Sequence, residues 1–239
     1  GPVLPDMGIW RPVTLLAFDA ARLDTVSFRQ EHTDGKVFLH CRAETDGNAE
    51  GAEVRYALQS PAGEDFPTVT VRSDREAVLE VEKPALWWPN GYGEHPLYRM
   101  TVTLLTNGTE SDEKTYFLGL RTLTVSTEAD RYGNEFCFVI NGRKIFSMGA
   151  NYVPQDNLPS RITPERTEKL LRQCADANFN TVRVWGGGFY PDDSFYDACD
   201  RLGLIVWQDF MVACNSVWLT DAREADFMAE FRDNLLRIR

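Results

Sequence analysis

The spacing of apolar residues changes near residue 126, and no other feature of the sequence restricts the fold as strongly. Before this point, apolar residues alternate with polar ones in short runs, which is typical of β-strands that bury one face. After it, short apolar runs are separated by segments with the periodicity of helices. The chain has 239 residues, of which 43% are hydrophobic, so each region can bury a core. The sequence therefore predicts two regions of different fold class.

The first region, residues 21–125, contains seven alternating runs separated by turn residues. The runs cover residues 26–30, 37–43, 54–58, 69–71, 79–81, 100–104 and 116–120. Seven short strands within about 100 residues are typical of an immunoglobulin-like sandwich, which we predict here. Cys41 is the only cysteine of this region, so the disulfide of antibody domains is not expected.

The second region begins with a hairpin signal, because Asn141-Gly142 between two apolar runs suits a type I′ turn. Strands and helices then alternate, which predicts parallel strands joined by crossover helices. The strands are expected over 145–149, 181–185 and 204–207, and the helices over 163–178, over 192–202 and from Thr220 or Asp221 onward. A complete (β/α)8 barrel takes roughly 250 residues. Three βα units therefore predict an incomplete TIM barrel, with a small open α/β sheet as the alternative.

The charge of the chain excludes some classes of partner. Lys and Arg number 25 while Asp and Glu number 36, which gives a net charge of −11. Such an acidic chain is expected to bind neither nucleic acid nor an anionic membrane, because both would repel it. No apolar run reaches the ~18 residues of a membrane-spanning helix.

The cysteines predict neither a metal site nor a disulfide framework, because they lack the paired spacing of both. The five cysteines are Cys41, Cys137, Cys174, Cys199 and Cys214. We therefore expect no metal and no cofactor. Unpaired cysteines and the lack of a leader sequence favour the cytoplasm.

Four polar or aromatic side chains lie at the ends of the expected parallel strands, where ligands of α/β folds bind. They are Asn151, Arg183, Trp185 and Asp209. An indole can stack on the apolar face of a sugar, and amide, carboxylate and guanidinium groups can hydrogen-bond its hydroxyls. This combination predicts a substrate-binding site for a neutral polyhydroxylated ligand.

Several of these residues also have a purely structural interpretation. Arg183 could be the ion-pair partner of a carboxylate within the sheet, and Asp209 a loop or capping residue. Trp207 is interpreted as a core aromatic residue and Asp156 as a turn residue. Both interpretations of Arg183 stay open on the sequence.

Three glycines follow Trp185, at residues 186–188. They are expected to leave the indole ring uncovered, which favours a role for Trp185 in binding. Their spacing is not that of a phosphate-binding loop. The glycines are therefore expected to permit a close approach of the backbone to a neighbour.

Several stretches resemble the family 2 glycoside hydrolases. Residues 8–13 (Gly-Ile-Trp-Arg-Pro-Val) resemble the closing strand of their sugar-binding jelly-roll domain. Residues 86–93 (Leu-Trp-Trp-Pro-Asn-Gly-Tyr-Gly) resemble part of their immunoglobulin-like domain. The stretches that resemble the start of their catalytic barrel, the last two being most similar to β-mannosidases, are residues 138–142, 149–151, 180–188 and 207–211.

The resemblance implies three domains. Residues 1–20 would close a sugar-binding jelly-roll domain, residues 21–125 would form the immunoglobulin-like β-sandwich, and residues 126–239 would form the N-terminal part of the (β/α)8 catalytic barrel. The parent protein would be an exo-acting retaining glycosidase, a β-mannosidase that hydrolyses terminal β-D-mannose residues from glycans.

The resemblance also implies roles for the site residues. Arg183 would orient the catalytic nucleophile, and Trp185, with Asn151 and Asp209, would line the sugar subsite. In the family, the acid/base and the nucleophile are Glu residues at the ends of later barrel strands, so both are expected beyond Arg239.

The chain is thus expected to be a fragment that is inactive alone and whose partner is a β-mannoside or an oligosaccharide. One alternative is a non-catalytic carbohydrate-binding or structural module. Another is a sibling activity, namely β-galactosidase, β-glucuronidase or exo-glucosaminidase. The open edge of the third barrel strand also predicts self-association into a homo-oligomer.

Overall fold

A computed structural model describes residues 8–213 and 221–238. The chain divides into two compact units, named here the sandwich unit and the α/β unit. The sandwich unit comprises residues 16–88 and 94–146. The α/β unit comprises residues 147–239 together with the short segments 1–15 and 89–93.

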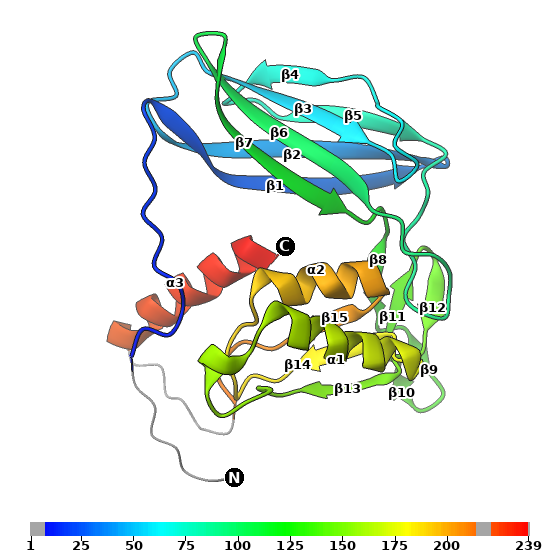
Figure 1. The fold of residues 1–239 in the computed structure, drawn as a ribbon. Coiled ribbons are helices and arrows are strands. Elements are labelled where there is room, and N and C mark those ends of the chain that lie inside the picture. Colours follow the sequence, from blue (N-terminus) through cyan, green and yellow to red (C-terminus); the bar gives the residue numbers. More distant parts are fainter. Residues whose placement is uncertain (1–7, 214–220, 239) are drawn as a thin grey trace. The chain divides into compact units, whose positions relative to one another are not determined.

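The sandwich unit contains two antiparallel sheets that pack face to face (Figure 1). Its strands are β1 (Ala21–Thr33), β2 (Lys36–Gly47), β3 (Glu53–Gln59), β4 (Val69–Arg72), β5 (Ala77–Glu82), β6 (Tyr98–Thr106) and β7 (Thr109–Leu118). One sheet has the order β1-β2-β5 and the other β4-β3-β6-β7. All seven strands predicted from the alternating runs are present, so the prediction of a β-sandwich is confirmed.

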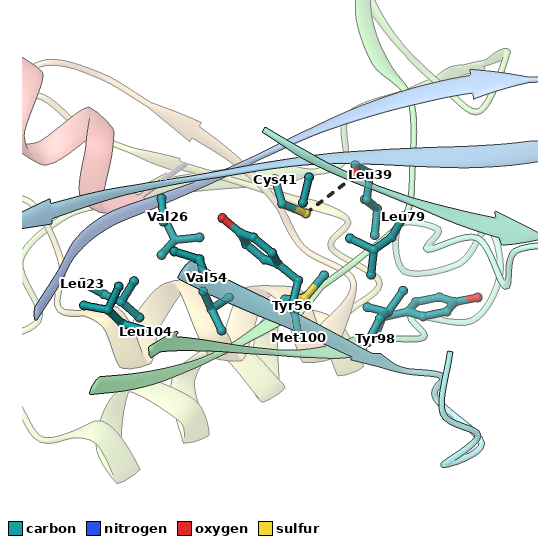
Figure 2. Close-up of a cluster of buried hydrophobic side chains, with 14 of the residues drawn as sticks. Leu23, Val26, Leu39, Cys41, Val54, Tyr56, Leu79, Tyr98, Met100 and Leu104 are labelled. Atoms are coloured by element: carbon teal, nitrogen blue, oxygen red, sulfur yellow. Dashed lines mark hydrogen bonds between the residues drawn. The ribbon is translucent and has the colours of Figure 1, made fainter. Parts of the chain in front are cut away.

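The core of the sandwich lies between the two sheets, as the alternation predicts. Along β2, Val37, Leu39 and Cys41 are fully buried, and the residues between them are more exposed. From the opposite sheet, Tyr56 of β3 and Met100 of β6 reach the same cluster (Figure 2). Burial raises the pKa of the Cys41 thiol to about 12, so it stays protonated and behaves as a small apolar group.

Trp87 fixes the segment after β5 within the sandwich unit, and the residue is 1% exposed. Its backbone N–H donates to Leu120 O at 2.9 Å, and its backbone carbonyl accepts from Asn141 Nδ2 at 3.0 Å. The guanidinium of Arg121 lies 4.6 Å from the centre of the Trp87 ring, in a cation–π contact. The first Trp of the Trp-Trp-Pro-Asn-Gly stretch is therefore a core residue.

The predicted hairpin at Asn141-Gly142 is present. The two turn residues have φ values of 49° and 77°, as a type I′ turn requires. The flanking strands pair antiparallel, and a third strand completes their sheet. The elements of this part of the sandwich unit are β8 (Leu123–Ser126), β9 (Ala129–Asp130), β10 (Gly133–Asn134), β11 (Cys137–Ile140) and β12 (Arg143–Ile145).

The prediction of a strand over residues 145–149 is wrong in its position. Ile145 ends β12, and the first parallel strand is β13 (Gly149–Tyr152). The shift has a steric reason, because a Cβ at Gly149 would lie 1.7 Å from the carbonyl oxygen of Thr181 on the neighbouring strand. Only glycine allows the two strands to meet so closely. Asn151 therefore lies within the strand.

The α/β unit is built on a parallel sheet. Its other elements are η1 (Pro159–Arg161), α1 (Pro164–Asp176), β14 (Thr181–Val184), α2 (Asp193–Leu202), β15 (Ile205–Gln208) and α3 (Asp221–Ile238). The strand order β13-β14-β15 follows the chain, so α1 and α2 connect neighbouring strands. Both helices pack on one face of the sheet (Figure 1), where Leu171 of α1 and Phe195 of α2 share a buried cluster with Val182 and Val184.

The helix ends follow the predicted signals. Thr163 Oγ1 accepts from Arg166 N at 3.3 Å before α1, and Gly203 adopts a φ of 69° after α2. The last helix begins at Asp221, while Thr220, the other expected start, lies outside the described residues. None of the described helices is long and apolar enough to cross a membrane.

The parallel sheet, as far as the structure describes it, has edges at β13 and β15. A strand edge offers N–H and C=O groups with which another strand can pair. The expected self-association through the third strand, β15, stays a prediction.

Asn180 is fully buried and ties together the beginnings of the three parallel strands. Its Oδ1 accepts from Met148 N and from Thr181 Oγ1, both at 2.9 Å. Its backbone carbonyl accepts from Ile205 N at 2.8 Å. Met148 directly precedes β13, Thr181 begins β14 and Ile205 begins β15, so one residue joins all three strands.

Asn90 closes the C-terminal ends of two helices of the α/β unit, to which residues 89–93 belong. Its Nδ2 donates to Ala175 O in the last turn of α1 and to Phe179 O, both at 2.9 Å. Its backbone N–H donates at 2.8 Å to the carbonyl of Gly203, the C-cap of α2. The last carbonyls of a helix have no partner within the helix, so these donors stabilise both helix ends.

Replacing Asn90 with alanine is expected to lower the free energy of unfolding of the α/β unit by about 1–3 kcal/mol, because the carbonyls of Ala175 and Phe179 each lose the hydrogen bond from Nδ2. Chemical denaturation followed by far-ultraviolet circular dichroism measures this loss, since the described α-helices all belong to this unit. Asn157→Ala is the matched control, because Asn157 is exposed in the same unit. Its expected change is below about 0.5 kcal/mol. Equal losses for the two variants would contradict the capping role.

Candidate functional site

Three side chains form a row across the parallel sheet near its carboxyl end. Asn151 of β13 lies opposite Arg183 of β14, and Arg183 lies opposite Trp207 of β15. The residues next to them in sequence, such as Val184 and Val206, pack in the cluster with α1 and α2. Because successive side chains of a strand point to opposite faces, the row lies on the face away from these helices.

Arg183, Asp209 and Asn151 form one hydrogen-bonded cluster. Arg183 Nε donates to Asp209 Oδ1 at 3.2 Å, and Arg183 Nη2 lies 2.7 Å from Asp209 Oδ2. Arg183 Nη1 donates to Asn151 Oδ1 at 3.1 Å. The structure thus brings together three of the four predicted site residues. A bidentate pairing of guanidinium and carboxylate is a strong interaction that also fixes geometry.

The guanidinium of Arg183 is the more accessible partner of this ion pair. The side chain of Arg183 is 41% exposed and that of Asp209 is 19% exposed. A guanidinium carries five N–H donors. The cluster engages each nitrogen once, so within residues 8–213 and 221–238 one donor on Nη1 and one on Nη2 are left for a ligand oxygen.

Trp185, the fourth predicted site residue, directly follows β14 and is half-buried. Its backbone N–H donates to Tyr152 O at 3.1 Å. A Cβ at Gly187 would lie 2.1 Å from Cη2 of the Trp185 ring, so the backbone of Gly187 packs directly on the indole. The expectation that the glycines leave this ring uncovered is therefore wrong. A residue without a side chain lets its own backbone cover the ring.

The other two glycines make the close approaches that the sequence predicts. A Cβ at Gly186 would lie 2.3 Å from the carbonyl oxygen of Phe210. A Cβ at Gly188 would lie 2.9 Å from Cγ of Pro154. The triple glycine therefore packs the loop after β14 against the segments that follow β15 and β13, and the interpretation as a close-approach segment is confirmed.

The interpretation of Trp207 as a core residue is wrong, because its side chain is 41% exposed. A continuous apolar run such as residues 204–207 is typical of a strand that is buried on both faces. Here α1 and α2 cover one face, which Val206 joins, and Trp207 belongs to the other. The pairing of Trp207 with Arg183 is the signal that identifies the face, and it is visible only once the register is known.

Two further residues support the cluster and were not predicted from the sequence. Gln208 Nε2 donates to the carbonyl of Asp209 at 2.8 Å, and Tyr196 Oη of α2 donates to Gln208 Oε1 at 2.7 Å. Burial raises the pKa of Tyr196, so its phenol stays protonated and can donate. A Gln at a strand end gives no signal of such a bond, because the partner lies on a different element.

Asp156 is a turn residue, as predicted, and has no contact with the Arg183 cluster. Its Oδ1 accepts from Leu158 N at 3.1 Å, and its Oδ2 accepts from Arg166 Nη1 at 3.0 Å. The Leu158 N–H, followed by the Arg166 guanidinium, lowers the pKa of this carboxyl. Within the described part of the chain, no group of His, Cys, Asp and Glu side chains is arranged to hold a metal ion.

An open hollow of about 500 Å³ lies along β13 and α1. Its walls are mainly apolar and include Val153, Leu170 and Phe179. Asn151 borders the hollow, whereas Arg183 and Asp209 are absent from its lining. The hollow is therefore a feature of the sheet edge and not of the Arg183 cluster.

Sequence comparisons identify similar proteins along the whole chain. Residues 21–121 match the sequence model of the family described as Glycosyl hydrolases family 2. A β-mannosidase B of Emericella nidulans is 35% identical over 100% of this chain and 29% of its own length. A β-mannosidase B of Aspergillus terreus is 38% identical over 90% of this chain and 26% of its own length. The chain thus spans less than a third of the relatives that it matches.

Comparison with solved structures gives a similar result. A β-D-mannosidase of Dictyoglomus thermophilum superposes with a TM-score of 0.85 and 32% identity, covering 93% of this chain and 28% of its own. A β-glucuronidase of Parabacteroides merdae superposes with a TM-score of 0.75 but only 15% identity, covering 91% of this chain and 28% of its own. The second likeness concerns the fold alone.

Proposed function

The chain carries a domain of family 2 of the glycosyl hydrolases, and on that premise we propose that it is part of an exo-acting retaining β-mannosidase. The observation that carries the proposal is the placement of Arg183. It projects from the face opposite α1 and α2 at the carboxyl ends of parallel strands, where α/β enzymes bind their substrates. The identity of 35% to a β-mannosidase B along the entire chain supports this choice of sugar.

The parallel sheet is proposed to be the first part of a (β/α)8 barrel, and the seven-strand sandwich to be the immunoglobulin-like domain before it. Strands that follow one another in chain order, with α1 and α2 on one face, are the arrangement from which a barrel is built. In a doubly wound sheet, the strand order would reverse and helices would cover both faces. The face with Arg183, opposite α1 and α2, would then line the interior of the barrel mouth.

Three of the four site residues, Arg183, Trp185 and Asn151, are proposed to act around one bound mannose unit. Arg183 would present its remaining N–H donors to the carboxylate nucleophile and so orient it. Trp185 would offer the open part of its indole ring to the sugar. Asn151 would hydrogen-bond a sugar hydroxyl through its amide nitrogen, because its oxygen already accepts from Arg183.

A retaining glycosidase needs two carboxyl groups about 5–5.5 Å apart, one as acid/base and one as nucleophile. Directly at the ends of the three described strands, Asp209 is the single carboxylate, and Arg183 and Gly186 occupy it. Both catalytic carboxyls are therefore proposed to come from outside this chain. The 239 residues alone are expected to hydrolyse no glycoside.

The test compares the 239-residue chain with a longer protein that carries it and matches the full length of the relatives. The longer protein is expected to hydrolyse an aryl β-D-mannoside with a kcat/KM at least about a hundredfold above that for the β-D-galactoside, β-D-glucuronide and β-D-glucosaminide, because hydroxyl recognition discriminates strongly. The chain alone is expected to show no turnover above the uncatalysed rate. Preference for another glycoside would assign a sibling activity. Turnover by the chain alone would refute the proposal that both catalytic carboxyls come from outside this chain.

A further inference from the structure

We propose that Asp209 is a positioning residue that holds the guanidinium of Arg183 in its working orientation, and that it does not bind the sugar itself. This proposal deepens the proposed function, on which it rests, and it assigns Asp209 a role different from the subsite role that the sequence suggests. The contacts of the carboxylate, of its backbone and of its neighbouring loop carry the argument.

The carboxylate of Asp209 faces Arg183 with both oxygens. Oδ1 accepts from Nε at 3.2 Å and Oδ2 lies 2.7 Å from Nη2, so the contact runs along one edge of the planar guanidinium. Two parallel contacts fix the rotation of the plane, which a single contact would leave free. Asn151 Oδ1 holds Nη1 from another side at 3.1 Å. The orientation of the guanidinium is thereby defined by two strand ends.

The carboxylate of Asp209 is itself held in place. Its Oδ2 accepts from the backbone N–H of Gly186 at 3.2 Å, in the loop directly after β14. Its own backbone N–H donates to Val184 O at 3.1 Å. Its carbonyl accepts from Gln208, which Tyr196 of α2 holds in turn. Three groups therefore hold Asp209 directly, and Tyr196 fixes one of them, before any ligand binds, as pre-organised sites require.

The absence of a side chain at Gly186 permits this arrangement. A Cβ there would lie 2.3 Å from Phe210 O and 3.1 Å from Asp209 Cβ. The loop after β14 can therefore approach the loop after β15 closely enough for the Gly186 N–H to reach the carboxylate. The same approach limits access to Asp209, whose side chain is 19% exposed, whereas that of Arg183 is 41% exposed.

The lone pairs of Asp209 point to the same assignment. A carboxylate has about four acceptor sites. Three of them face Arg183 Nε, Arg183 Nη2 and Gly186 N. A sugar hydroxyl would have to compete with a charged bidentate partner for the shielded group, while donors of Arg183 lie more exposed beside it. Arg183 is therefore the member of the pair that meets the reacting groups.

A double-mutant cycle in the longer protein tests the proposal, with kcat and KM measured on whichever aryl glycoside the unmodified protein hydrolyses best. Asp209→Asn is expected to lower kcat about tenfold to a hundredfold with little change in KM, because a misplaced group weakens the transition state. In the Arg183→Ala background, the same change is expected to cost no more than about threefold, since Asp209 acts through Arg183. Asp209→Glu keeps the charge and is expected to retain more activity than Asp209→Asn.

Asp192→Asn serves as the matched control, because Asp192 is an exposed carboxylate that precedes α2 in the same unit, and Asn caps a helix as well as Asp does. Its expected kcat is unchanged. A raised KM with equal losses in both backgrounds would show that Asp209 binds the sugar and would overturn the proposal. An unchanged kcat for Asp209→Asn would overturn it as well. The cycle uses whichever aryl glycoside the unmodified protein hydrolyses best. A failure of the β-mannosidase assignment is therefore seen on the unmodified protein, independently of the result for Asp209.

Discussion

Arg183→Ala in the longer protein is expected to lower kcat/KM for an aryl β-D-mannoside by about a thousandfold. The reason is electrostatic, because a fixed cation at the strand ends stabilises charge on neighbouring reacting groups, and one such donor is worth up to about 10³ in rate. Arg183→Lys is expected to recover little of this loss. A lysine ammonium cannot span both oxygens of Asp209 and also reach Asn151 with a planar fork.

Steady-state kinetics on purified variants measure this effect. Arg172→Ala is the matched control, because Arg172 lies on α1, is exposed, and pairs with Glu168 one helical turn away. It removes the same charge from the same unit without touching the cluster, and its expected kcat/KM is unchanged. Circular dichroism and the midpoint of thermal unfolding report whether Arg183→Ala folds. If Arg183→Ala folds and its kcat/KM falls by less than about tenfold, the proposed role of Arg183 in the reaction is contradicted.

Trp87→Ala is expected to lower the free energy of unfolding of the sandwich unit by about 3–5 kcal/mol. Trp87 is 1% exposed, so removal of its indole leaves a large cavity. The Arg121 guanidinium also loses its cation–π contact with the ring. Trp87→Phe, which keeps an apolar ring, is expected to lose less. Hydrogen exchange of the amides of β3 and β6 in the full chain measures the loss, because these strands belong to the same unit and their protection reports on its opening.

The same substitution at an exposed position provides the comparison. Trp207 is 41% exposed, and Trp207→Ala is expected to lower the free energy of unfolding by about 1 kcal/mol or less. The protection of β3 and β6 is expected to remain as in the unmodified chain, since Trp207 belongs to the other unit. Equal loss of protection in the two variants would mean that burial of Trp87 does not stabilise the sandwich unit.

Local patterns account for most of what the sequence predicted correctly. The period of two along β2 identified Val37, Leu39 and Cys41 as one buried face. Thr163 and Gly203 marked helix ends because capping depends on the residue itself and on its immediate neighbours. The site residues Asn151, Arg183 and Asp209 could be expected near one another, because parallel strands end at the same edge of a sheet.

Features that depend on register or on distant partners could not be predicted. The exposure of Trp207 follows from its pairing with Arg183, and the shift of β13 follows from the contact between Gly149 and the Thr181 carbonyl. Asn90 caps two helices that lie far from it in sequence. Nothing in its own neighbourhood reveals those acceptors, so only the folded chain shows what the residue does.

The two ends of β14 divide their tasks, and this has a consequence for how such a protein can diverge. Asn180, just before the strand, joins the strands of the sheet, while Arg183, near its end, is the residue proposed to meet the ligand. Substitutions at the Asn180 end are expected to lower stability, and substitutions at the Arg183 end are expected to lower turnover. Stability and activity can therefore be selected separately. A laboratory search for altered substrate preference can therefore randomise the rim of this sheet and keep its base constant.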